Sequence, residues 1–587
     1  MSRVNIGVFI CHCGSNIGGV VNIEKVLDYA QTLPLVKYAE DNLYTCSDAG
    51  LSSIKEKIAR HDLNRVVVAS CTPRTHEELF RRACEEAGLN RYLFEFVNIR
   101  EHCSWIHMKL PDEATKKAME LLRLGVKKAA YLVPLEIARA KVKPAVLVIG
   151  AGIAGLTAAL NLGKQGFQVH LVEQSDKLGG IAAGLWKLIP GDRPAHQLVE
   201  NLVNNVKKLK NVNIYLNGRV GDISGFIGSF DVLIDTSRGK REFSVGTVII
   251  ATGAQELEPH GLYGLGELEG VLTQRQLEQA LVRGRKRFTD VVFINCSGAR
   301  TPGREYCGRI CCGTSIKNAR YIREMCPGAR VTVLQRDMMA YGTELEMAFR
   351  SAQEAGVRFI RYDPERPPQV LGNNKVSRVR VYHALAGMEV TLPASIVVLA
   401  TPLVPHDSAV GLARMLKVPV DSFGFFLEAH MKLRPVEFAT DGVYIAGSAR
   451  FPANIREASA QGMAAAAKAA APMTAGEVPL EATTAKTETR LCSGCGNCKM
   501  ICPFSAIEME IDNQGRTVSV VNAVLCKGCG SCTAACPNGA VQQQGFTDMQ
   551  IFSMIDSLAL EGDQGGTLFE KTAPPGPPRQ KLLINGG

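Results

Sequence analysis

The chain opens with short apolar runs that alternate with amphipathic stretches, the pattern of a parallel α/β unit. Strands are expected in NIGVFI near the start and in RVVVAS at 65–70, with helices beginning near Asn22 and Thr75. The pattern resets near residue 141, where the strand AVLVIG opens a larger α/β region that runs to about residue 472. A stretch rich in Ala, Thr and Pro follows, and then a Cys-dense segment at 490–545.

Composition narrows the function classes. Lys and Arg exceed Asp and Glu by ten, but the basic residues are spread along the chain, which indicates solvated faces rather than a nucleic acid-binding surface. The first residues lack the features of a secretory signal, and no apolar stretch is long enough to span a bilayer. The 19 Cys in short-spaced clusters therefore predict a metal-binding protein of the cytoplasm rather than a disulfide-bonded one.

The most specific motif is C-x2-C-x2-C-x3-C-P, which occurs twice in residues 490–545. It is the pattern of ferredoxins with two 4Fe-4S clusters, in which three Cys bind one cluster and the fourth reaches the other. Zinc knuckles need two Cys pairs across a longer loop, so they fit poorly. The expected ligand sets are Cys492, Cys495, Cys498 and Cys536 for one cluster, and Cys526, Cys529, Cys532 and Cys502 for the other.

A dinucleotide site is predicted at the start of the larger region. Gly150, Gly152 and Gly155 spell G-x-G-x-x-G between the strand AVLVI and an Ala- and Leu-rich helix, and a second strand ends at Glu173. The glycines let a pyrophosphate approach a helix N-terminus, and the carboxylate accepts from ribose hydroxyls. A structural turn is the alternative for the glycines alone, but their context favours a nucleotide.

Later motifs resemble the signatures of two-dinucleotide-binding flavoproteins, the family of thioredoxin reductase, and this resemblance implies FAD. In that family the last signature ends in Gly-Asp, with the Asp on the ribityl chain, so a Ser at that place is a departure. The motifs are SDKLGGIAAG with Gly179 and Gly180, TVIIATGAQ with Ala251, Thr252 and Gly253, and DGVYIAGSAR with Gly447 and Ser448.

The second glycine-rich loop of that family, which binds NAD(P)H, is expected after the strand DVVFIN at 290–295 and is absent. Four Cys where a pyrophosphate would bind favour a 4Fe-4S cluster, and the vicinal pair among them leaves a redox disulfide as the alternative. These residues are Cys296, Cys307, Cys311 and Cys312.

Over its whole length the chain resembles the flavin-binding member, HdrA, of heterodisulfide reductase, a family of electron-bifurcating complexes. The resemblance implies that the four Cys between 296 and 312 hold a cluster close to the flavin, and that Lys317 approaches the flavin N5. Larger family members insert a further ferredoxin module, whereas residues 181–290 contain no Cys. The matching segments are GVFICHCGSNIG, NLYTCSDAG, ASCTPRTHEELFRRACEEAGLN, NIREHCSW, INCSGAR and YCGRICC, besides the flavin and ferredoxin motifs.

The N-terminal unit has its own candidate ligands. Cys46, Cys71 and Cys103, together with Cys11 or Cys13, lie near the ends of predicted strands, where α/β sheets bind their ligands. A further 4Fe-4S cluster is one interpretation, and burial of the thiols as small apolar groups is the other. Packing is the expectation for Cys84 and Cys326.

The sequence thus predicts an α/β protein with a two-dinucleotide-binding, thioredoxin reductase-like flavoprotein core between an N-terminal α/β domain and a C-terminal ferredoxin domain with two 4Fe-4S clusters. The expected segments are the N-terminal domain (1–140), the first part of the FAD domain (141–285), the region like an NAD(P)H domain (286–395), the second part of the FAD domain (396–472), a linker (473–489), the ferredoxin domain (490–545) and a C-terminal helix and tail (546–587).

We expect an FAD-dependent iron–sulfur oxidoreductase, with FAD as the bifurcating centre that distributes electrons to the clusters. The expected partners are HdrB/HdrC-like subunits, an electron-donating hydrogenase-, dehydrogenase- or ferredoxin-linked subunit, and a second copy in a homodimer of the complex. Substrate reduction would occur on a partner subunit. The alternatives are a non-bifurcating conduit to a quinone-linked complex and an NAD(P)H-dependent flavin oxidoreductase, and the absent glycine-rich loop counts against the latter.

Overall fold

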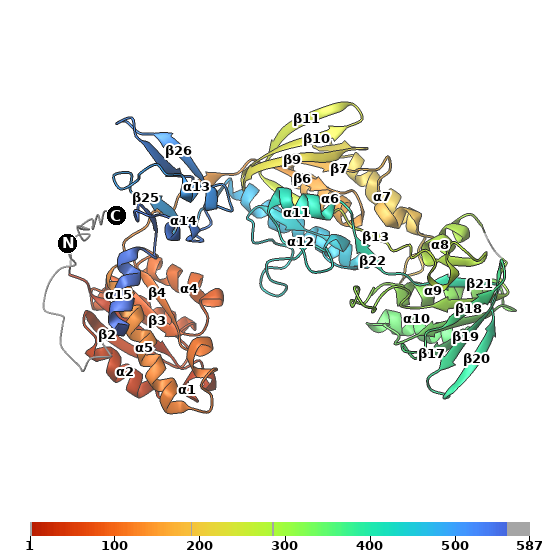
Figure 1. The fold of residues 1–587 in the computed structure, drawn as a ribbon, viewed down its shortest axis with the longest axis horizontal. Helices are drawn as coiled ribbons and strands as arrows, with labels where there is room; N and C mark the ends of the chain where they lie inside the picture. Colours follow the sequence, from red (N-terminus) through yellow and green to blue (C-terminus); the bar gives the residue numbers. More distant parts are fainter. Residues whose placement is uncertain (1–2, 190, 285–286, 560–587) are drawn as a thin grey trace, which may run out of the picture. The chain divides into compact units, whose positions relative to one another are not determined.

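The structure is a computed structural model that describes residues 3–189, 191–284 and 287–559. The chain folds into two compact units (Figure 1). One unit contains the residues up to Ala138 and those from Pro479 on, and the other runs from Arg139 to Val478. The predicted N-terminal and ferredoxin domains therefore share a unit, although the flavoprotein core separates them in the sequence.

The first unit is built on a parallel sheet of order β2-β1-β3-β4. β1 and β3 are buried along almost their whole length, as is typical of central parallel strands. The side chains of Asn22, Ser47 and Thr72 cap the helices that follow them. The elements are β1 Ile6–Cys11, α1 Ser15–Gly18, α2 Ile23–Thr32, β2 Val36–Asn42, α3 Asp48–Arg60, β3 Arg65–Ser70, α4 Pro73–Glu86, β4 Phe94–Asn98, the π-helical turn Arg100–Ser104 and α5 Pro111–Ala130.

The ferredoxin part of this unit consists of two similar halves. Its two short helices each begin after a glycine with positive φ, Gly496 and Gly530. β25 lies within residues 473–489, expected to be a linker, and pairs with β28, so part of this stretch belongs to the ferredoxin fold. The elements are β25 Ala485–Thr487, α13 Asn497–Ile501, β26 Ile507–Ile511, β27 Thr517–Val521, α14 Ser531–Ala534 and β28 Val541–Gln543.

Helix α15, Asp548–Ala559, lies against α5 and joins the two parts of this unit (Figure 1). Arg123 of α5 donates to the Ser557 hydroxyl at 2.8 Å. The Lys128 ammonium pairs with Glu95 at 2.9 Å and lies 3.9 Å from the centre of the Phe546 ring. The expected C-terminal helix is therefore present, whereas the expected tail at 560–587 lies outside the described residues.

The second unit contains two parallel five-stranded sheets. The first has the order β23-β12-β6-β7-β8, with α6 packed against α12 on one of its faces (Figure 1). Helix α12 continues through Pro472 and ends at Ala475, later than the sequence pattern indicated. The elements are β6 Ala145–Ile149, α6 Ile153–Lys164, β7 Gln168–Val172, α7 Ala195–Lys207, β8 Val212–Tyr215, the antiparallel strands β9 Arg219–Phe226, β10 Ser229–Thr236 and β11 Gly239–Val245, β12 Thr247–Ile250, α11 Ala409–Leu416, β23 Val443–Ile445 and α12 Ile455–Ala475.

The second sheet has the order β14-β21-β15-β16-β17. It takes β14 and β21 from outside residues 286–395, so its folded region is wider than that segment. The elements are β14 Val271–Thr273, α8 Gln274–Val282, β15 Asp290–Ile294, α9 Cys311–Met325, β16 Arg330–Gln335, α10 Thr343–Glu354, β17 Arg358–Arg361, the antiparallel strands β18 Gln369–Gly372, β19 Val376–His383 and β20 Met388–Pro393, and β21 Ile396–Leu399.

Short strand pairs and turns complete the second unit. The elements are β5 Arg139–Lys141, β13 Ala254–Glu256, β22 Leu403–Pro405, β24 Glu477–Pro479 and the 3-10 turns Gly180–Gly184, Leu262–Gly264 and Gly447–Ala449. Within the described residues, no helix combines the length and apolar character that a membrane crossing requires.

Candidate functional site

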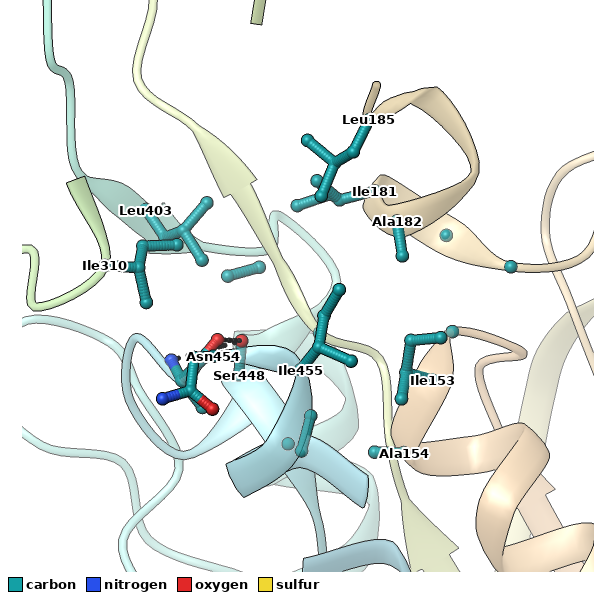
Figure 2. A pocket seen from close by; sticks show the side chains of 18 of the residues that line it. Ile153, Ala154, Ile181, Ala182, Leu185, Ile310, Leu403, Ser448, Asn454 and Ile455 are labelled. Atoms are coloured by element: carbon teal, nitrogen blue, oxygen red, sulfur yellow. Dashed lines mark hydrogen bonds between the residues drawn. The ribbon is translucent and has the colours of Figure 1, made fainter. Parts of the chain in front are cut away.

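A cavity of about 650 Å³ lies in the second unit, where β6, β7, β12 and β23 end (Figure 2). It gathers all of the predicted flavin-site residues except Gly155. Ile153 and Ala154 stand on one side of it, and Ile310 and Leu403 on another. The predicted residues in its lining are Gly150, Gly152, Glu173, Gly179, Gly180, Ala251, Thr252, Gly253, Lys317, Gly447 and Ser448.

The glycine-rich loop is shaped by close backbone contacts. Gly150 has a φ of +100°, which favours glycine. A Cβ on Gly155 would lie 1.9 Å from the Gly150 carbonyl oxygen, so Gly155 supports the loop from outside the cavity. Gly152 caps α6, and a Cβ there would meet no protein atom within 4 Å. The loop therefore leaves open space beside a helix N-terminus, which suits a pyrophosphate.

Glu173 is buried at the end of β7. Its carboxylate accepts from the Ala151 N–H at 2.8 Å and from the Ser175 N–H at 2.9 Å, which fixes its position. Each carboxylate oxygen keeps a further lone pair for a ribose hydroxyl. A second cavity, of about 800 Å³, shares Glu173 with the first and extends to Val220 and Met415, which gives room for an adenosine.

The cavity wall fits a dinucleotide in another respect. The Thr252 hydroxyl oxygen is buried and has no hydrogen-bond partner among the described residues, and buried polar groups in proteins are normally paired. Together with the space beside Gly152 and the Glu173 carboxylate, it offers polar contacts that the fold itself does not use. These residues fit an FAD.

The Ser448 side chain forms hydrogen bonds of 3.4 Å with the backbone N–H and carbonyl of Ala453 (Figure 2). It thereby orders the turn that leads to Asn454, the capping residue of α12, which lines the cavity. The N-terminus of α12 is thus held at the cavity, where it favours negative charge on a bound group.

Lys317 lies on α9, five residues beyond the vicinal Cys pair, and is 2% exposed. Its ammonium pairs with Glu278 at 2.5 Å and donates to the Lys187 carbonyl at 2.7 Å. Burial lowers the pKa of Lys317, and the neighbouring Glu278 opposes this shift. The structure therefore places a cation, held by a buried carboxylate, in the wall of the cavity.

Glu278 and Arg309 are site residues that sequence reasoning missed. Arg309 lies in the cavity wall, between two predicted cluster ligands, and pairs with Glu457 of α12 at 2.7 Å. It also donates to the Pro452 carbonyl at 3.1 Å. A buried acid on the apolar face of α8, beside Leu277 and Leu281, was the available signal for Glu278.

The four Cys of the predicted flavin-proximal cluster lie together. The Cys311 and Cys312 thiols share a hydrogen bond, which raises the pKa of Cys311 and lowers that of Cys312 to about 7. Burial raises the pKa of Cys296 to about 11, and Cys312 and Cys307 contribute to this shift. The vicinal pair consists of thiols, so this structure shows no redox disulfide there. The arrangement fits a cluster held by four thiolates.

One ferredoxin ligand set is brought together as predicted. Cys502 joins Cys526, Cys529 and Cys532 around a small cavity, so the fourth Cys of the first motif reaches the second. A hydrogen bond with Ser531 lowers the pKa of Cys529, which favours the thiolate. The remaining Cys492, Cys495, Cys498 and Cys536 form the complementary set, and stay a prediction.

The N-terminal unit brings four of its five candidate Cys together. Burial raises the pKa of Cys71, and the thiols of Cys13, Cys11 and Cys46 raise it further. Cys103 does not join this group, since its thiol donates to the Ala114 carbonyl at 2.9 Å. Both Cys11 and Cys13 therefore belong to the group, rather than one of them.

Among the described residues, no three His, Cys, Asp or Glu side chains converge as they would around a single metal ion. A cube of four irons holds its thiolates farther apart than one ion does. The grouping of thiols without His or carboxylates matches the soft ligands of iron–sulfur clusters.

Comparison with known proteins decides the family. Residues 144–462 match the family described as pyridine nucleotide-disulphide oxidoreductase, and residues 491–540 match the 4Fe-4S dicluster domain. The first of the iron-sulfur HdrA chains of CoB--CoM heterodisulfide reductase in Methanopyrus kandleri is 37% identical over 95% of this chain and 98% of its own length. The chain belongs to the HdrA family of heterodisulfide reductases.

Two further members of this family show the same extent of similarity. The HdrA chain of the H(2):CoB-CoM heterodisulfide,ferredoxin reductase of Methanothermobacter marburgensis is 37% identical over 87% of this chain and 91% of that one. The HdrA chain of the ferredoxin/F(420)H(2)-dependent CoB-CoM heterodisulfide reductase of Methanosarcina acetivorans is 33% identical over 86% and 75%. The predicted fold class is confirmed, and so is the prediction of an FAD-dependent iron–sulfur oxidoreductase.

The open space at Gly152 gives a first prediction for this family member. Gly152→Val keeps a φ of −74° that valine adopts, but fills the space for the pyrophosphate, so we expect FAD content to fall at least about tenfold. The thermal midpoint should match that of wild-type protein stripped of FAD. Gly328→Val, in open space outside the cavity lining, is the control and should retain FAD. Full FAD retention by Gly152→Val would contradict the site.

The N-terminal group gives a second prediction. Cys71→Ser should remove about four irons per chain, the content of one cube, because it deletes one of four converging thiols. Cys103→Ser should leave the iron content unchanged, since its thiol is used for packing. Iron and sulfide analysis of protein purified without oxygen measures both. Equal iron loss in the two variants, or none in either, would contradict this assignment.

Proposed function

We propose that this chain is the flavin and iron–sulfur electron-transfer subunit of a heterodisulfide reductase-like complex, in which FAD is the bifurcating centre. One observation carries the proposal. Ile310, Gly313 and Thr314, which flank the vicinal Cys pair, line the same cavity as the glycine-rich loop. Thiols suited to a cluster are thus built into the wall of a flavin-sized cavity.

The proposed cofactors have complementary roles: FAD, when bound, exchanges electrons in pairs, whereas each cluster carries one. The chain contributes position and charge. The Lys317 ammonium would stabilise negative charge on the flavin, and Glu278 keeps this lysine in place. The dipole of α12 acts in the same sense from the other end of the cavity. Burial of these groups strengthens each interaction relative to water.

The clusters would give electrons separate routes away from the flavin. We propose four 4Fe-4S clusters, one close to the flavin, one in the N-terminal domain and two in the ferredoxin domain. HdrB/HdrC-like subunits would carry the substrate reduction, and a hydrogenase-, dehydrogenase- or ferredoxin-linked subunit would supply electrons. The names of the relatives from Methanothermobacter and Methanosarcina, with ferredoxin and the CoB-CoM heterodisulfide, support this choice of partners.

The potentials of the flavin test this function. In spectroelectrochemistry of the protein purified without oxygen, we expect the second electron to enter at a higher potential than the first, so that reduction is one two-electron step. Two separated one-electron steps would support a non-bifurcating conduit instead. NAD(P)H alone should leave the flavin oxidised, because the loop after β15 carries thiols in place of glycines, and rapid bleaching would support an NAD(P)H reductase.

Lys317 gives a more local prediction. Lys317→Gln should lower the ratio of reduced to oxidised flavin at a fixed potential about tenfold, which is about 30 mV for a two-electron couple. Lys187→Met is a matched control, since Lys187 lines the cavity but its ammonium lies 3.9 Å from the centre of the Tyr321 ring. Because Glu278 would be left buried and unpaired, the double variant with Glu278→Gln should show the same shift with better stability. An unshifted flavin potential would refute the role of Lys317.

A further inference from the structure

A chain of buried hydrogen bonds leads from α8 to one of the thiols of the flavin-proximal group. Its members are Gln274, Ser315, Asn295 and Cys312, and all four are at most 6% exposed. They come from three separate elements, namely α8, α9 and the end of β15. Buried polar groups are retained at a cost unless each is satisfied, so the direction of every bond can be followed.

The direction of this chain is fixed by a backbone carbonyl. The Gln274 side chain lies 3.1 Å from the Cys311 carbonyl oxygen, which can only accept, so the amide nitrogen of Gln274 must face it. The same nitrogen lies 2.5 Å from the Ser315 hydroxyl oxygen and donates its second hydrogen there. The Ser315 proton is therefore left to point elsewhere.

The remaining bonds follow from this start. Ser315 donates to the side-chain oxygen of Asn295 at 2.7 Å. The side-chain nitrogen of Asn295 must then face the other way, and it donates to the Cys312 sulfur at 3.6 Å. A flipped Asn295 amide would set two lone pairs against each other at the sulfur and leave the Ser315 proton without an acceptor. The network thus presents an N–H to this sulfur.

We propose that Asn295 is a positioning residue that raises the reduction potential of the flavin-proximal cluster by donating a hydrogen bond to the Cys312 sulfur. The inference rests on the proposed function, because it requires a cluster at this thiol group. Hydrogen bonds to cluster sulfurs stabilise the more negative, reduced state. The donor is oriented from behind by Ser315 and Gln274, and such outer partners tune a metal centre in a dry site.

The potential of this cluster tests the proposal in the full-length protein. Its electron paramagnetic resonance signal is identified as the one that Cys307→Ser removes or alters. At a fixed potential, Asn295→Ala should lower the ratio of reduced to oxidised cluster about tenfold, which is about 59 mV for one electron. Asn295→Asp should lower it further, because a carboxylate adds negative charge. Should the Asn295 variants fail to assemble the cluster, Ser315→Ala decides, with an expected decrease of about threefold.

Tyr362→Phe is the matched control. The Tyr362 hydroxyl donates to the backbone carbonyl of Asn295 at 2.9 Å and is equally buried, but it makes no bond to the sulfur. Its removal should leave the potential within about twofold of wild type. An equal shift in Tyr362→Phe and Asn295→Ala, or an unshifted potential in Asn295→Ala with the cluster intact, would overturn the proposal. Iron content that Cys307→Ser leaves unchanged would refute the flavin-proximal cluster itself, and the proposed function with it.

Discussion

Parallel strands end together at one edge of their sheet, and every candidate site of the N-terminal and flavoprotein regions depends on this constraint. β1 and β3 pair in parallel and lead directly to Cys11 and Cys71. β6 and β7 pair in parallel and lead to Gly150 and Glu173. The flavin-proximal thiols follow the same rule, since the first of them comes two residues after β15. The register of buried strands therefore fixes which side chains converge, before any loop contributes.

Sequence spacing predicted the parts of the sites that are local. The ferredoxin ligands lie within two short segments, and the turn geometry around their glycines leaves few arrangements. The glycine-rich loop was predictable for a similar reason, because crowding at Gly150 and Gly155 is a property of one strand, turn and helix. In both cases the chemistry dictates residue types at fixed spacing, so one pattern predicts both fold and ligand.

Contacts between distant segments could not be predicted in this way. Cys103 follows β4 at the expected edge, yet a π-helical turn carries its thiol toward α5, and only tertiary packing determines that direction. Glu278 reads as a polar position of an exposed helix, but lies on the buried face of α8 opposite Lys317. The linker was misjudged for a related reason: β25 is three residues long and gains its structure from pairing with β28.

The loops that carry the thiols have a conformational cost that a nucleotide-binding loop avoids. Cys13, Cys296 and Arg309 have φ values of +47°, +61° and +57°, a region that glycine enters freely but other residues enter at about 1–3 kcal/mol each. Glycine at Cys13 or Cys296 would relieve this strain and remove a thiol. The buried pair of Lys317 and Glu278 adds a desolvation cost of the same kind. These costs fall on the groups that face the proposed cofactors, so cofactor binding is the interaction that offsets them, and the order of the site is linked to what it holds.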